Sequence, residues 1–132
     1  MQDYRNLRVW QKAHELTLET YAFSATLTAP AAWPLRDQLL RAVISVPSNI
    51  AEGAGRGSDA DFHRSLHHSL GSLNEVEYDF ILARDLGFME CSEHSRLCTQ
   101  LEEVRRMLSG LMTQLKARLA RRGRNPATDP ER

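Results

Sequence analysis

Aromatic side chains are few in this chain of 132 residues, at 7%, and it has only two cysteines and no net charge. No apolar run approaches the ~18 residues that a membrane-spanning helix requires. The first residues, MQDYRNLRVWQK, lack the apolar core of a signal peptide. We therefore expect a cytoplasmic protein that does not engage a membrane. Its two cysteines, Cys91 and Cys98, are expected to be free thiols, because seven helical residues separate them by about 10 Å.

Motifs that carry chemistry are also missing. No Gly-x-Ser-x-Gly elbow is present. His63 and His67 lie one helical turn apart, as metal ligands can, with His68 beside them. The Glu of a His-Glu-x-x-His motif is missing, no third ligand is obvious, and no Glu-x-x-His pair occurs, so we expect solvated histidines on a helix surface. A Gly-x-Gly-x-Gly run from Gly53 to Gly57 precedes a predicted helix, yet no strand or Gly-Lys-Ser/Thr accompanies it. These absences predict no enzyme activity, no metal and no cofactor.

The residues that are abundant favour helices. The chain is 42% hydrophobic and 26% charged, and leucine, alanine, arginine and glutamate outnumber β-branched residues. Apolar side chains recur at steps of three and four, which predicts helices over about residues 7–27, 35–54, 59–86 and 93–122. Short connections between such helices are typical of an antiparallel up-down-up-down four-helix bundle. We expect one domain over residues 1–123 and a disordered polar tail over residues 124–132.

Two of the predicted helices carry a second line of residues beside the apolar one. On the helix over 35–54, small and polar residues from Ala42 to Arg56 suit the close approach of a neighbouring helix. The apolar register there continues through Pro47, which predicts one bent helix and not two. On the helix over 59–86, a second line indicates either a helix central in its domain or a surface shared with another subunit, and a small bundle favours the shared surface. This predicted oligomer interface consists of Gly71, Glu75, Tyr78, Leu82 and Leu86.

Charge is distributed unevenly along the chain. Residues 1–115 carry 11 basic and 15 acidic side chains, net −4, whereas residues 116–132 carry six basic and two acidic side chains, net +4. A basic end of this kind can hold phosphates, or it can complement the dipole of the last helix. The candidate nucleic-acid contacts are Lys116, Arg118, Arg121, Arg122 and Arg124.

The segment from Ser45 to Arg56, SVPSNIAEGAGR, resembles the signature of the four-helix bundle proteins encoded by intervening sequences of bacterial 23S ribosomal RNA genes. The opening segment from Tyr4 to Ala13, YRNLRVWQKA, is similar to the start of the same family. The resemblance extends from about Tyr4 to Leu119. Further matches are Gln38 to Val43, Phe62, Gly71, Ser72, Glu75, Glu77, Leu86 and Gly87.

The resemblance implies a homo-oligomeric ring, with a pentamer favoured, and no known enzyme activity. It also implies kinship with the accessory protein of diversity-generating retroelements, which assists a reverse transcriptase through nucleic-acid contacts. The family-motif surface would consist of Ser48, Asn49, Glu52 and Arg56, as a structural cluster or as a surface for a partner. Two functions therefore compete: an oligomeric adaptor that binds protein, and a nucleic-acid-binding accessory factor that uses the basic C-terminal residues.

Overall fold

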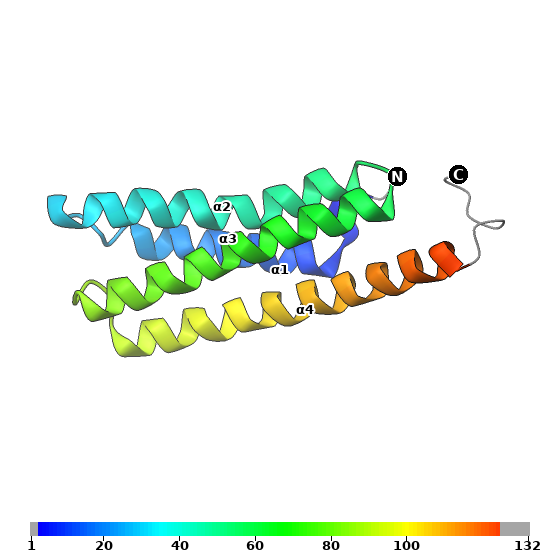
Figure 1. Ribbon diagram of the computed structural model, residues 1–132. Helices are drawn as coiled ribbons and strands as arrows, with labels where there is room; N and C mark the ends of the chain where they lie inside the picture. Colours follow the sequence, from blue (N-terminus) through cyan, green and yellow to red (C-terminus); the bar gives the residue numbers. More distant parts are fainter. Residues whose placement is uncertain (1–2, 125–132) are drawn as a thin grey trace.

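The described part of the chain, residues 3–124 of a computed structural model, folds into four α-helices without strands. They are α1 (Arg8–Ser24), α2 (Trp33–Ala54), α3 (Asp59–Asp85) and α4 (Cys91–Arg124), with short 3-10 helices η1 (Tyr4–Asn6) and η2 (Pro30–Ala32). Successive helices run in opposite directions (Figure 1). Among the described residues α1 packs against α2 and α4, and α3 packs against α2 and α4, so each helix has two neighbours. The predicted all-α class and the bundle packing are confirmed.

The helix ends differ from the predicted ends by a few residues. Helix α1 stops at Ser24, three residues early, and the chain then turns before Pro30. Helix α2 starts at Trp33, two residues early, because proline is tolerated in the first turn of a helix and Pro34 lies there. Helix α4 continues to Arg124. Of the predicted polar tail, residues 124–132, all but Arg124 lies outside the described residues.

The core lies along the common axis of the four helices. Leu16, Leu39, Leu73 and Leu108, one from each helix, are completely buried. Burying a leucine stabilises the folded state by about 1.5–3 kcal/mol. The steps of three and four in the sequence therefore identify the faces that form the core. No helix in residues 3–124 is long and apolar enough to cross a membrane.

Helix α2 continues through Pro47 as one helix, as predicted. A proline inside a helix has no N–H to donate to the carbonyl four residues earlier, here that of Val43. The hydroxyl of Thr17 on α1 lies 3.3 Å from that carbonyl oxygen and 2.9 Å from the carbonyl oxygen of Ala13. The side chain of Thr17 thus offers a donor to the carbonyl that Pro47 leaves without its helical partner, and it joins α1 to α2.

Helices α2 and α3 approach each other closely. A Cβ atom built on Gly53 would lie 2.6 Å from the Cβ atom of Ser65, so no larger side chain fits there without movement. Farther along, the hydroxyl of Ser69 donates a 2.8 Å hydrogen bond to the carbonyl oxygen of Val46. The second line on α2 is therefore a close helix contact, which confirms the sequence interpretation of its small residues.

Candidate interaction surface

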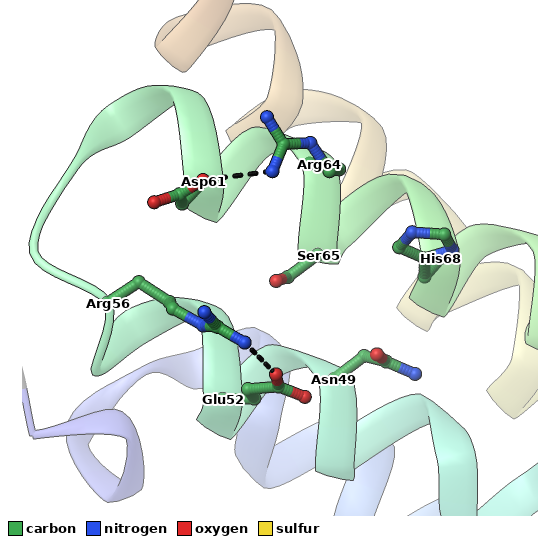
Figure 2. Close-up of a pocket in the computed structure, with 7 residues that line it drawn as sticks. All are labelled: Asn49, Glu52, Arg56, Asp61, Arg64, Ser65 and His68. Atoms are coloured by element: carbon green, nitrogen blue, oxygen red, sulfur yellow. Dashed lines mark hydrogen bonds and ion pairs between the residues drawn. The ribbon is translucent and has the colours of Figure 1, made fainter.

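The outer side of the α2–α3 pair carries a polar groove made of two adjoining hollows. The first hollow, of about 340 Å³, lies near the turn between the helices (Figure 2). The second, of about 390 Å³, continues along the helices away from that turn. Asn49 and His68 line both hollows, so we treat them as one α2–α3 groove. Its lining residues are Ser45, Asn49, Glu52, Arg56, Asp61, Arg64, Ser65, His67, His68, Gly71, Ser72 and Glu75.

Three of the four predicted family-motif residues line this groove. The side-chain amide of Asn49 donates to the carbonyl oxygen of Ser45 at 2.8 Å and to its hydroxyl at 2.9 Å. The hydroxyl of Ser72 on α3 donates to the same Ser45 hydroxyl at 2.8 Å. Asn49 therefore belongs to a hydrogen-bonded link between α2 and α3, which supports the structural interpretation of this residue.

The charged residues at the turn end of the groove neutralise one another. Glu52 accepts from the Arg56 guanidinium at 2.5 Å, and this carboxylate raises the pKa of Arg56. Across the groove, Asp61 accepts from Arg64 at 3.0 Å (Figure 2). Ser48, the fourth motif residue, is exposed on α2 and lines neither hollow. The motif thus contributes one internal link, one surface ion pair and one outward hydroxyl.

The predicted oligomer interface on α3 divides into three parts. Gly71 and Glu75 line the groove. Tyr78 and Leu86 are 59% and 57% exposed, which is high for large apolar side chains. Leu82 is half-buried and packs against the core. A charge at Leu82 would therefore disturb the bundle itself, so Tyr78 and Leu86 are the better positions for testing the surface.

The predicted nucleic-acid contacts at the end of α4 also divide. Arg118 and Arg122 bind the carboxylate of Asp59 at the start of α3, at 3.1 Å and 2.6 Å. Lys116 and Arg121 are exposed, and no described residue pairs with either of them. The side chain of Arg124 lies outside what the structure describes. Two of the five basic residues therefore hold α4 to α3.

One buried carboxyl was not recognised from the sequence. Asp79 on α3 is 4% exposed, and its Oδ2 atom has no hydrogen-bond partner among the described residues. Burial raises its pKa from 3.8 to about 6, with a smaller contribution from the negative charge of Glu75. Asp79 continues the line of Ser69, Ser72 and Val76 at steps of three and four. That spacing puts Asp79 on the side of α3 that faces its neighbours, so the burial of this acid could have been predicted from the sequence.

The histidines and cysteines form no metal site within residues 3–124, where no three ligand-type side chains come together. His67 and His68 instead line the groove. The sulfur of Cys98 lies 3.4 Å from a ring nitrogen of His94, and burial raises the pKa of this thiol. A raised pKa keeps a thiol protonated and unreactive at neutral pH.

The model of the family described as 23S rRNA-intervening sequence protein matches residues 5–110. The chain belongs to this family. The family resemblance inferred from the sequence is thereby confirmed over residues 5–110. The match includes helices α1 to α3, the α2–α3 groove and the first part of α4. No curated protein matches the chain.

A solved structure supports the fold of this family member. The crystal structure of a protein of unknown function from the S23 ribosomal protein family, from Bacteroides thetaiotaomicron, is similar with a TM-score of 0.74. The two chains are 23% identical, and the alignment covers 79% of this chain and 97% of that one. At this identity the likeness supports the bundle fold and carries no function.

Proposed function

We propose that this 23S rRNA-intervening sequence protein is a cytoplasmic, non-enzymatic interaction module that works as a homo-oligomeric ring, with five copies favoured. The observation that carries the proposal is the exposure of Tyr78 on α3 and of Leu86 directly after it, at 59% and 57%. Both belong to one line with Gly71 and Glu75. Apolar side chains grouped on one helix face of a small domain typically mark a protein contact.

The chemistry of the groove favours binding over catalysis. Catalytic acids and bases are commonly groups whose pKa values are strongly shifted inside a cleft. The carboxylate of Glu52 is instead neutralised by Arg56 in the turn after α2, and that of Asp61 by Arg64 on its own helix. The carboxyl with a pKa raised to about 6, that of Asp79, does not line the groove. A polar groove whose turn end carries paired charges, beside exposed apolar residues, suits an adaptor for protein partners.

The test is the molar mass of variants, measured by light scattering after gel filtration at micromolar concentration. Tyr78→Glu and Leu86→Glu together should yield a monomer, because each apolar side chain buried in a contact contributes roughly 1.5–3 kcal/mol. Far-UV circular dichroism should stay at the wild-type level. Thr113→Glu, which changes an exposed residue of α4, is the matched control and should keep the wild-type mass. An unchanged mass for the double variant would place the contact elsewhere.

Nucleic-acid binding is the second candidate function, supported by the exposed and unpaired Lys116 and Arg121 near the end of α4. Such contacts neutralise phosphates without reading bases, so binding should be weak and should fall steeply between about 50 and 200 mM salt. A ring would multiply the sites and raise the avidity. Lys116→Gln with Arg121→Gln should abolish RNA retention while keeping the fold, because neither side chain pairs with Asp59. Binding that survives both changes would exclude this end of α4 as the site.

A further inference from the structure

The exposed carboxylates on the helices are paired with cations, with one exception. Of the exposed carboxylates on the helices that the structure describes, only Glu75 has no ion-pair partner. It lines the far part of the α2–α3 groove. The side chain one turn farther along α3 is Tyr78, which is 59% exposed. An unpaired carboxylate and an apolar side chain thus lie next to each other on α3, and both are accessible to a binding partner.

A cation with the matching arrangement lies on α2. Among the described side chains, the unpaired exposed cations are Arg8, Arg41, Arg106, Lys116 and Arg121. Only Arg41 has a large exposed apolar side chain one turn away on its own helix, namely Ile44, which is 41% exposed. The pair of Arg41 and Ile44 therefore repeats the spacing of Glu75 and Tyr78 with the opposite charge.

The surface beside Ile44 extends onto α1. The Thr17 hydroxyl lies 3.3 Å from the Val43 carbonyl oxygen, which fixes the register of the two helices. Leu18, which is 57% exposed, therefore lies at about the same level as Ile44, and Tyr21, which is 46% exposed, lies about one turn farther along α1. The described residues therefore form two surfaces that combine exposed apolar side chains with one unpaired charge. The surface on α3 carries the carboxylate of Glu75, and the surface shared by α1 and α2 carries the guanidinium of Arg41.

We infer that these two surfaces bind each other between copies of the chain: Glu75 of one copy pairs with Arg41 of the next, and Tyr78 packs against Leu18, Tyr21 and Ile44. The inference rests on the proposed self-association and adds its second surface. A contact between two different surfaces leaves one of each free on a pair of copies. It therefore propagates until a ring closes, whereas a two-fold contact stops at a dimer.

The test is to reverse each charge separately and then mix the two proteins. Glu75→Arg and Arg41→Glu should each weaken association on the order of 100-fold, because like charges then face each other in every contact. In an equimolar mixture the copies can alternate, so that opposite charges meet at every contact and association returns. An alternating ring must contain an even number of copies, so the mass of the mixture should differ from that of a five-copy wild type.

Controls keep this test separate from the proposed function. Arg106→Glu reverses an exposed, unpaired charge on α4 and should leave association unchanged, and circular dichroism should show all variants folded. A monomeric wild type would overturn both the inference and the proposed self-association. A wild type that associates, with charge-reversed variants that do so equally well, would overturn the inference alone. Variants that stay monomeric after mixing would also overturn it. If residues 75 and 41 of different copies face each other, mixing restores opposite charges at the contact and association must return.

Discussion

Outside the shared core, helix α2 meets α3 through small residues, whereas α4 meets α1 and α3 through long charged ones. At the α2–α3 contact, Gly53 allows a close approach and serine hydroxyls cross between the helices. Helix α4 is instead tied to α1 by ion pairs such as that of Arg96 with Glu19, and to α3 by that of Arg105 with Glu77. Surface ion pairs are individually weak, and close packing is specific. The α2–α3 pair should therefore be the less tolerant of substitution.

The largest effect is expected at Gly53. Gly53→Ala should lower the free energy of unfolding by about 1–3 kcal/mol, because the new Cβ would lie 2.6 Å from that of Ser65. Gly110→Ala is the matched control on α4, where a Cβ meets nothing within 4 Å. It should stabilise the protein by about 0.5–1 kcal/mol through helix propensity. Urea unfolding measures the free energy of unfolding of both variants. Equal changes in the two variants would contradict the claim that the α2–α3 contact is less tolerant of substitution than α4.

An intermediate effect is expected at Asp79, the buried acid on the line of α3 that also carries Ser69 and Ser72. Its pKa is about 6 in the folded protein against an ordinary 3.8, so the folded state binds the proton more tightly than the unfolded state. Its contribution to stability is therefore most favourable below about pH 4 and declines as the pH rises to about 6. Asp79→Asn should raise the free energy of unfolding at pH 7 by about 1–3 kcal/mol.

The check for Asp79 is urea unfolding of both proteins at pH 7 and pH 4.5. The advantage of the asparagine variant should shrink at the lower pH, since the wild-type carboxyl is then protonated and neutral. A variant less stable than wild type at pH 7 would mean that the charged carboxylate has a stabilising partner.

The smallest effect is expected where α4 meets α1. Arg96 pairs with Glu93 on its own helix at 2.7 Å and with Glu19 on α1 at 3.0 Å, and all three are at least partly exposed. Arg96→Gln should lower the free energy of unfolding by less than about 1 kcal/mol. The difference from wild type should diminish further at 1 M salt, because exposed charges are screened. A loss as large as that expected for Gly53→Ala would contradict the contrast between the two contacts.

Much of the fold was accessible from the sequence because apolar spacing determines which helix faces meet. The spacing of the leucines on α4 correctly predicted that they lie in the core. The small residues before Gly53 correctly predicted a close contact of α2 with a neighbouring helix. Helix ends were less accessible, since Pro34 is compatible both with a loop and with a first helical turn. Spacing also predicted that the residues of the proposed oligomer interface lie on one side of α3. It did not predict that Leu82 packs against the core while Tyr78 is exposed.

The surface was harder to predict because it depends on which residues different helices bring together. Arg118 and Arg122 read as free cations in the sequence, and their partner Asp59 lies about sixty residues away. His68 gave no sign of lining a groove, because the opposite wall is formed by Asn49 of another helix. Likewise, the sequence does not show that Glu75 lacks an ion-pair partner, because this depends on where the folded chain places the cations.

The most direct test of the account is the molar mass of the wild-type protein, measured by light scattering after gel filtration over a range of micromolar concentrations. One chain has a mass of 15.0 kDa. Self-association through the α3 surface predicts a discrete multiple of that mass, with five copies favoured and little change on dilution. A mass of 15.0 kDa throughout the range would contradict the account, because Tyr78 and Leu86 would then remain in water.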